Sequence, residues 1–271
     1  IDSRLCWEGR INRTDLCTTF GISVPQASLD IARYTQLAPG NLTYDRVTRA
    51  YLPGARFRPL FPSTSVEQFL RELRANQTAD GVEAPVALVP TPARGIELSV
   101  LRPLWRAIRE RTGLRVIYQS LSRAKPEART LSPHALAHDG FRWHVRAYCH
   151  LRSEFRDFVM ARMLEVKQAT PFGRDAAEDQ EWHSYVTLVL VPHPQLSAAH
   201  RRAIELDYGM VRGQVELQCR RALLFYVLHQ LRLDESSSRR PESQQIVLKN
   251  AAQIARHSRS GGRSIGVTPL A

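Results

Sequence analysis

The middle of the chain contains the stretch that decides its fold, Gly140-Phe141-Arg142-Trp143-His144-Val145-Arg146-Ala147-Tyr148. Residues of two kinds alternate along it, which is typical of a β-strand with one buried face. We expect one side to face a core and the other to face away, the first side being Trp143, Val145 and Ala147 and the second Arg142, His144, Arg146 and Tyr148. Residues 114–120 and 155–162 show the same period of two. Turns such as His138-Asp139-Gly140 separate these runs, so the region predicts a small antiparallel β-barrel.

An amphipathic helix is expected ahead of these strands, over residues 96–111. Its apolar side would carry Leu101, Leu104, Trp105 and Ile108, at the spacing of one helix face.

Several motifs of this region occur in a fixed order. They are Ile117-Tyr118-Gln119-Ser120, Arg129-x-x-x-Pro133, the stretch 140–148, and Phe155-Arg156-Asp157-Phe158-x-x-x-Arg162. Together they resemble a WYL domain over about residues 94–170. The Trp-Tyr-Leu after which the domain is named is Trp143-His144-Val145 in this chain. The role of the tyrosine therefore passes to His144 only by position.

The resemblance implies a small Sm/SH3-like β-barrel with a ligand pocket. The pocket residues that it implies are Tyr118, Ser120, Arg129, His144 and Arg156. Arginine binds phosphate in bidentate fashion, hydroxyls add hydrogen bonds, and histidine gains charge near an anion. We therefore expect an anionic nucleotide or oligonucleotide as effector. The alternative for each lone arginine is a solvated surface residue.

The first 52 residues have the pattern of a helix-turn-helix followed by a hairpin. Asn12 or Thr14 can cap a helix that Gly21 ends, and Ser23 can cap a second helix. After Pro39-Gly40, residues 42–45 and 49–52 can pair as two strands, with 46–48 at the tip of a wing. This order predicts a winged helix-turn-helix.

A winged helix binds double-stranded DNA through the N-terminal end of its second helix. That placement puts Ser23, Gln26 and Ser28 near base edges, where Gln26 can bond an adenine. Phosphate contacts would come from the wing and the helix side, from Arg33, Arg46, Thr48 and Arg49. The alternative is a helical hairpin that packs internally, with Gln26 and Ser28 merely solvated.

The distribution of charge agrees with a phosphate-bearing partner. The chain has 38 basic and 26 acidic residues, a net charge of +12. The excess lies in residues 94–170, with 15 basic and 7 acidic residues, and in residues 236–271, with 6 and 1. Such a field attracts nucleic acids and nucleotides. The alternative is a solvated basic surface.

The last part of the chain predicts a small α/β unit. A strand over 184–191, a helix from Ser197 to Leu206, a strand over 210–217 and a helix over 220–231 follow one another. Residues 245–248 can add a strand, and the tail from Ser236 is expected to be partly disordered or exchanged with a partner. We interpret the acidic run Asp175, Glu178, Asp179 and Glu181 as a solvated hinge rather than a metal site.

The whole chain resembles WYL-domain transcription factors of the BrxR/CapW type, which are regulators associated with phage defence. The α+β chain would then divide into a winged helix (1–55), a linker with a helix (56–93), a WYL sensing domain (94–170) and an α/β dimerisation domain with tail (171–271). The resemblance implies a homodimeric, ligand-responsive repressor of a defence operon, bound to an inverted repeat. Two alternatives stay open: a nucleic-acid-binding accessory module of a defence complex, and a nucleotide-processing enzyme.

The sequence contains no catalytic constellation. His134 and His138 stand four residues apart but lack the glutamate of a zinc-protease motif, and no phosphate-binding loop occurs. The cysteines Cys6, Cys17, Cys149 and Cys219 are scattered, so we expect no disulfide framework, metal or cofactor. No apolar run has the length of a membrane span and residues 1–8 lack a secretory pattern. We expect a cytoplasmic, nucleoid-associated protein.

Overall fold

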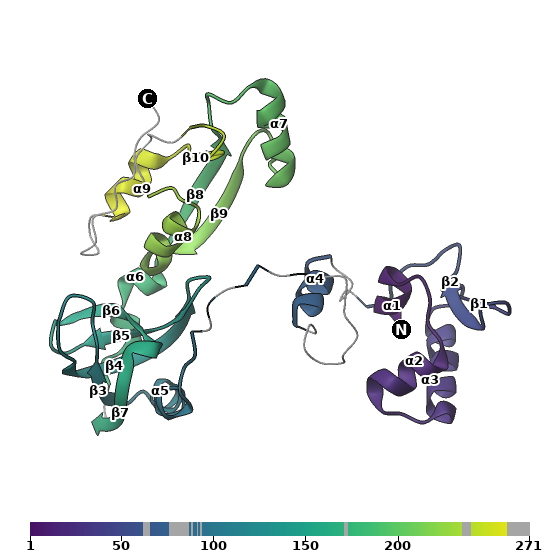
Figure 1. Cartoon of the computed structure of the whole chain (residues 1–271), viewed down its shortest axis with the longest axis horizontal. Helices are drawn as coiled ribbons and strands as arrows, with labels where there is room; N and C mark the ends of the chain where they lie inside the picture. The colour runs from purple at the N-terminus through teal and green to yellow at the C-terminus, as the bar shows by residue number, and fades with distance from the viewer. Residues whose placement is uncertain are drawn as a thin grey trace. The chain divides into compact units, whose positions relative to one another are not determined.

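The computed structural model describes residues 1–61, 66–75, 87, 89, 90, 92, 94–170, 173–234 and 240–258. The chain divides into two compact units, Ile1–Pro90 and Thr91–Ala271 (Figure 1). The first unit has one apolar core and the second has two, and each unit is described by itself.

The first unit has the helices and the hairpin of a winged helix. It contains α1 (Asp2–Trp7), α2 (Arg13–Phe20), α3 (Val24–Leu37), β1 (Leu42–Asp45), β2 (Ala50–Pro53) and α4 (Val66–Ala75). Asn12 forms a capping box with Asp15 at the start of α2, and Gly21 ends that helix at φ 64°. The predicted helix boundaries are thereby confirmed, whereas α1 was not predicted.

A buried carboxylate ties α1 to the rest of the first unit. Asp2 is 5% exposed and accepts a hydrogen bond from the hydroxyl of Tyr34 on α3. It also accepts from the backbone N–H groups of Leu60 at 2.6 Å and Phe61 at 2.8 Å. Burial, together with the bond to Asp2, raises the pKa of Tyr34 to about 12.

The second unit begins with a helix and an antiparallel sheet. Helix α5 (Leu98–Glu110) precedes strands in the order β6-β5-β4-β3-β7. The strands are β3 (Gly113–Tyr118), β4 (Glu127–His138), β5 (Trp143–Cys149), β6 (Glu154–Val159) and β7 (Met163–Thr170). The predicted run 155–162 ends as a strand at Val159 and continues as the 3-10 turn η2 (Met160–Arg162). Among the described ladders none joins β6 to β7, so the strands form a sheet whose ends are linked by this turn.

Helix α5 covers the apolar face of this sheet. Leu104 of α5 is fully buried and belongs to one core with Val116, Leu131, Val145 and Phe158. Val145 and Ala147 face this core, as predicted.

Two tryptophans were assigned to the core wrongly. Trp143 is 46% exposed because it is the first residue of β5, and the ladder with β6 ends one residue later, at His144. Its ring contacts only the neighbouring ring of His138 among the described aromatic pairs, at 4.8 Å between centroids. Trp105 is 51% exposed because the apolar stripe of α5 is centred on Val100, Leu104 and Ala107.

The C-terminal part of the second unit is a smaller sheet covered by helices. The segment contains η3 (Ala176–Glu178), α6 (Gln180–His183), β8 (Tyr185–Pro192), α7 (Ala198–Asp207), β9 (Val215–Arg220), η4 (Arg221–Leu223), α8 (Leu224–Gln230), β10 (Ile246–Leu248) and α9 (Ala251–Ser258). The strand order is β10-β8-β9, so the predicted strand near 245–248 pairs with β8 of the same chain. Ser197 caps α7 as predicted.

One strand of this part begins later than predicted. We expected a strand over 210–217, but β9 starts at Val215. The preceding residues form a turn in which Arg212 (φ 54°) and Gly213 (φ 75°) are left-handed, and two such residues in a row interrupt an extended strand. The tail from Ser236 was predicted to be partly disordered or exchanged, but over residues 240–258 it is ordered, with β10 and α9 packed in the core of the same chain. Residues 236–239 and 259–271 of the tail lie outside the described residues.

Candidate nucleic-acid interface and effector site

Helix α3 buries one apolar face and presents polar side chains to solvent, together with the exposed Val24, Leu29 and Leu37. Ala27, Ile31 and Tyr34 are buried, whereas Ser23, Gln26 and Arg33 are exposed. The Ser23 side chain accepts from the N–H of Gln26 and thereby caps the helix. Two polar groups of this face already have partners within the helix: the Gln26 amide donates to Asp30 at 2.8 Å, and the Ser28 hydroxyl donates to the carbonyl of Val24 at 2.9 Å.

The hairpin β1–β2 carries exposed arginines at its tip. Arg46, Thr48 and Arg49 are exposed, and Arg49 has a left-handed backbone at φ 52°. Asp45 holds the turn, because it accepts from the N–H of Val47 at 2.9 Å and the hydroxyl of Thr48 at 2.5 Å. The pKa of Asp45 is lowered by these bonds, first by that from Thr48. Thr48 therefore stabilises the wing, while the arginines are presented to solvent.

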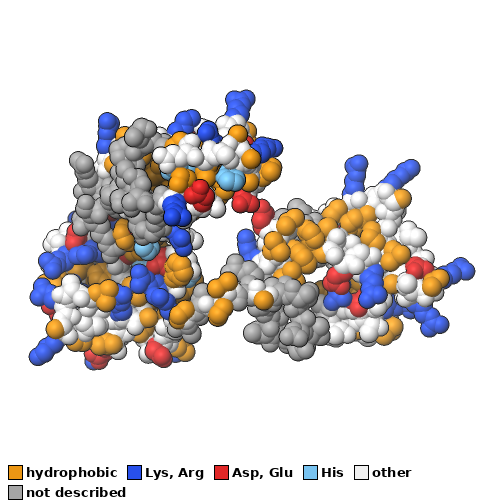
Figure 2. All heavy atoms as spheres, turned by 45° about the horizontal axis from the view of Figure 1, so that its top comes forward, with side chains coloured by type: hydrophobic (Ala, Val, Ile, Leu, Met, Phe, Trp, Pro, Cys, Tyr) orange, Lys and Arg blue, Asp and Glu red, His pale blue; other side chains and the backbone are white. Residues whose placement is uncertain are grey.

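Basic side chains project from the surfaces of both units (Figure 2). On the first unit the exposed arginines include Arg33 of α3 and Arg46 and Arg49 of the wing.

Three of the five predicted pocket residues share one face of the larger sheet. Arg129 pairs with Val116, and Arg156 pairs with Ala147, so both are on the side of the apolar core, as is Tyr118. The Tyr118 hydroxyl accepts from the N–H of Val159 at 3.2 Å. Ser120 lies just beyond β3, with its hydroxyl 3.3 Å from that of Ser122.

Arg129 is a buried cation with only part of its guanidinium paired. The residue is 8% exposed, and its Nη2 donates to Glu127 at 3.0 Å. Its Nη1 lies 3.9 Å from the sulfur of Cys149, and its Nε has no hydrogen-bond partner among the described residues. Arg156, at the rim, is exposed and donates to Glu154 at 3.0 Å. Arg129 and Arg156 are thus two cationic groups on this face, one buried and one exposed.

His144 lies on the opposite face, away from the other predicted pocket residues. It pairs across the ladder with Val159, its Nε2 is 2.8 Å from Asp139, and its ring packs on Tyr226 of α8. Its Nδ1 has no partner among the described residues. Burial lowers the pKa of His144, an effect that Asp139 partly opposes. The five residues therefore do not meet in one place.

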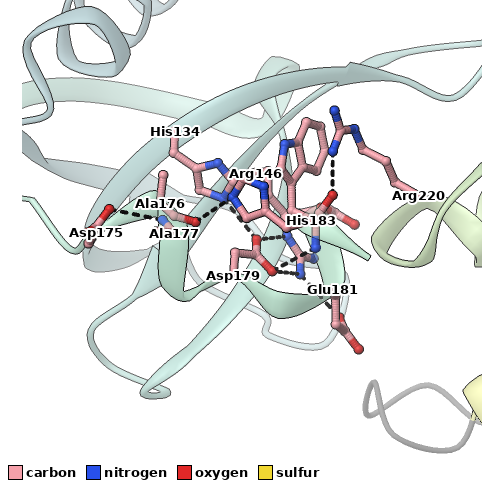
Figure 3. A network of polar contacts seen from close by, with 11 residues as sticks. His134, Arg146, Asp175, Ala176, Ala177, Asp179, Glu181, His183 and Arg220 are labelled. Carbon is pink, nitrogen blue, oxygen red and sulfur yellow. Dashed lines mark hydrogen bonds and ion pairs between the residues drawn. The ribbon is translucent and has the colours of Figure 1, made fainter. Parts of the chain in front are cut away.

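The same face carries a buried network that sequence reasoning missed (Figure 3). Arg146 of β5 is 3% exposed and donates two hydrogen bonds to Asp179, from Nε to Oδ2 at 2.7 Å and from Nη2 to Oδ1 at 3.0 Å. Further contacts join Arg146 to Asp157 at 3.3 Å and to Glu181 at 3.2 Å, and His134 to Asp179 at 2.9 Å. The hydroxyl of Tyr226 donates to Asp157 at 3.0 Å, which adds α8 to the network.

The interpretation of the acidic run as a solvated hinge is wrong for Asp179, which is 1% exposed. Burial alone would raise the pKa of Asp179, but the bonds from His134 and Arg146 hold it well below its usual range. One signal in the sequence was available. An arginine in a largely buried strand requires a carboxylate partner, and the acidic run follows about thirty residues later.

The described part of the chain contains neither a metal-binding cluster nor a membrane-spanning helix. No group of three or more His, Cys, Asp or Glu residues could hold a metal ion there. Within the same residues, no helix combines the length and apolar character needed to cross a membrane.

The arrangement of domains defines a class of protein, the transcriptional regulators that combine a winged helix with a WYL domain; these are DNA-binding proteins rather than enzymes. Three family models match in order: the BrxR winged helix-turn-helix domain over residues 1–75, the WYL domain over 99–168 and the BrxR C-terminal dimerization domain over 185–254. The resemblance stated from the sequence is thereby confirmed, as is the α+β fold with its winged helix.

Close relatives narrow the class to a family. DNA-binding transcriptional repressors CapW are 44% identical over 263 residues in Escherichia coli (strain KTE188), 46% over 263 in Pseudomonas aeruginosa and 44% over 266 in Stenotrophomonas maltophilia. Each alignment covers 94% of this chain and 88% of the relative. The chain belongs to the BrxR/CapW family of DNA-binding transcriptional repressors. A solved structure, proteasome accessory factor B/C of Arthrobacter aurescens, aligns at 16% identity over 92% of this chain and 44% of its own, with a TM-score of 0.28, too low to support a conclusion.

Proposed function

We propose that this protein is a homodimeric repressor that binds an inverted repeat upstream of a phage-defence operon and responds to a phosphate-bearing effector. DNA binding is assigned to residues 1–55, sensing to 94–170 and dimerisation to 171–271, with 56–93 as the connection. A DNA partner of this kind implies a location at the nucleoid, in the cytoplasm.

The exposed polar face of α3 carries the proposal for DNA binding. Its first turn is capped by Ser23, so the helix can enter a major groove with Gln26 toward the bases. The Gln26 amide must exchange its bond to Asp30 for an adenine, and Ser28 contributes less because its hydroxyl bonds the helix backbone. Arg33, Arg46 and Arg49 would contact phosphates, and Thr48 would keep the wing in shape.

Paired substitutions test this assignment. Gln26→Ala should weaken binding to the operator by about 1–3 kcal/mol and leave binding to random DNA nearly unchanged. Arg46→Ala should weaken both and reduce the dependence on salt, because it removes a phosphate contact. Gel shifts against the DNA upstream of the gene and against a scrambled duplex measure both. Equal losses on the two duplexes for Gln26→Ala would remove α3 from base reading.

The incompletely paired guanidinium of Arg129 carries the proposal for sensing. A buried cation with an unused donor favours an anionic ligand, and Arg156 at the rim can add a bidentate phosphate contact. Tyr118 on the same side and Ser120 just beyond the end of β3 would supply hydroxyls. His144 would act from the other face, as a link between the sensing strand β5 and helix α8.

The effector can be sought with defined probes, a mononucleotide set and a short 5′-phosphorylated single strand. A probe that binds should change operator affinity by about 1–3 kcal/mol, and operator DNA must change probe affinity by the same factor. Arg156→Ala should abolish this response and keep basal operator binding, whereas Arg152→Ala, an exposed arginine outside the site, should keep both. A normal response in Arg156→Ala would remove Arg156 from the site, and lost basal binding would make it a DNA contact.

A further inference from the structure

The outward side of helix α3 carries a large apolar side chain among polar ones. Leu29 is 65% exposed, whereas Ala27 and Ile31, two residues before and after it, are buried. Because a helix turns about 100° per residue, Leu29 points away from the buried side of α3. Among the described residues it takes no part in the apolar core of the first unit. The exposure of Leu29 therefore follows from its place on the helix and not from a frayed helix end.

The polar neighbours of Leu29 are residues that are assigned to DNA above. Gln26 precedes it by three residues and Arg33 follows it by four, so the three exposed side chains are neighbours on the helix surface. A single exposed leucine is common on a protein surface and needs no explanation by itself. This leucine, however, lies on the helix of a winged helix-turn-helix domain that enters the major groove, where binding removes it from water.

The major groove offers one kind of apolar group to such a side chain. Base pairs display hydrogen-bond donors and acceptors there, and the methyl group of thymine is the apolar exception. A leucine packed on a donor or acceptor would leave that group without a partner, which costs free energy. A leucine packed on the methyl group instead removes two apolar surfaces from water. The chemistry of Leu29 therefore favours thymine over the other three bases.

The spacing along α3 limits where that thymine can lie. An α-helix rises about 1.5 Å per residue, so Leu29 lies about 4.5 Å farther along the axis than Gln26. Neighbouring base pairs are stacked about 3.4 Å apart. The thymine should therefore lie within about two base pairs of the adenine assigned to Gln26.

We propose that Leu29 is a specificity-determining residue that contacts the methyl group of a thymine in the operator. The contact adds an apolar readout to the hydrogen-bond readout by Gln26 on the same helix. The proposal rests on the use of α3 for base reading proposed above.

Removal of single methyl groups from the DNA tests this contact. Deoxyuridine lacks only the methyl group of thymidine, so the duplex keeps its hydrogen-bond donors and acceptors. A footprint on the DNA upstream of the gene defines the duplex, which is then synthesised with one thymine at a time replaced by uracil. Gel shifts give the dissociation constants for the wild type, Leu29→Ala and Leu29→Met. The matched control is Leu37→Ala, a leucine that is 58% exposed at the end of the same helix.

Uracil at one thymine of a half-site should weaken binding of the wild type and of Leu37→Ala by about 4-fold, the contribution of one buried methyl group. Leu29→Ala should bind the unmodified duplex at least about 4-fold more weakly and should not respond to uracil at that thymine. Leu29→Met keeps an apolar side chain of similar size and should retain the response. Thermal unfolding of the variants checks that the fold is intact.

Three results would overturn the assignment of Leu29 while Gln26→Ala still distinguishes the operator from random DNA. They are a uracil effect that persists in Leu29→Ala, the absence of a uracil effect throughout the footprint, and the loss of the effect in Leu37→Ala as well. Equal losses on the operator and on random DNA for Gln26→Ala would instead overturn base reading by α3, and the contact of Leu29 with it.

Discussion

The same strands form both faces of the larger sheet, but apolar side chains cover one face and polar and charged side chains cover the other. One face is apolar, with Leu104 of α5 over Val116, Leu131 and Val145. The other face buries Arg146 and His144, and it is covered by Asp179 and by Tyr226 of α8. The apolar face joins the sheet to its own helix, whereas the polar face joins the WYL domain to the C-terminal domain.

The two faces are expected to respond differently to the loss of a side chain. Removal of atoms from the apolar face leaves a cavity, and the loss of stability is graded with its volume. Removal of one partner from the polar face leaves a buried charge with too few bonds, and we expect its cost to be somewhat larger. The polar contact between the two domains is therefore disrupted as a whole when one of its members is removed.

The largest effect is expected from Asp179→Ala. This change leaves Arg146 buried without its bidentate partner, so the free energy of unfolding should fall by about 4 kcal/mol. The control Glu178→Ala, one residue away, removes a carboxylate that is 43% exposed and should change little. Urea unfolding measures both. Similar small losses in the two variants would show that the network adds nothing to stability.

A slightly smaller loss is expected on the apolar face. Leu131→Ala removes a fully buried side chain from the core under α5 and should lower the free energy of unfolding by about 3 kcal/mol. Leu164→Ala, at 62% exposure, serves as the control and should stay close to wild type. A larger loss in the free energy of unfolding for Leu131→Ala than for Asp179→Ala would reverse the proposed order of the two faces.

A smaller effect should appear on acidification. Burial lowers the pKa of His144 below its ordinary value of 6.5, so the unfolded chain takes up the proton first. The stability that neutral His144 contributes is complete above pH 6.5 and is lost as the pH falls through its folded pKa. Asp139 opposes this shift, which limits its size. Urea unfolding between about pH 7 and about pH 5 should therefore show a weaker pH dependence in His144→Gln than in the wild type. Identical slopes would contradict this role.

The smallest effect on stability is expected for Arg156→Ala. The pair of Arg156 with Glu154 is exposed, at 43% and 51% for the two side chains, so its loss should cost less than about 0.5 kcal/mol. Thermal unfolding of this variant beside the wild type checks the value. A large loss would place Arg156 with the structural arginines rather than with the sensing residues.

The sequence predicts those features whose signals are local. Asn12, Gly21 and Ser23 mark helix ends because a cap needs only its own turn, and the structure places the caps there. Alternation along 143–149 likewise identifies which residues share a face of β5. The start of β9 was misjudged because two left-handed residues, Arg212 and Gly213, interrupt an otherwise strand-like composition.

Local sequence patterns could not predict which of the site residues lie together on one face of the sheet. Alternation assigns parity within one strand, but only the register between strands relates the parity of one to that of the next. The pairs Val116–Arg129 and His144–Val159 put Arg129 and His144 on opposite faces. The partner of Arg146 was equally hidden, because Asp179 is separated from it by 33 residues and by two further strands.

The bidentate ion pair between Arg146 and Asp179 also constrains which substitutions this sequence can accept during evolution. A chain that loses Asp179 is penalised mainly by the arginine left behind, so a second change at position 146 recovers part of the loss and the two effects are not additive. A chain with only one of the two residues replaced is therefore an unstable intermediate on the way to the double substitution. Across related repressors these two positions should change as a pair, and Asp157 and Glu181 should follow them, as one unit of inheritance that spans two domains.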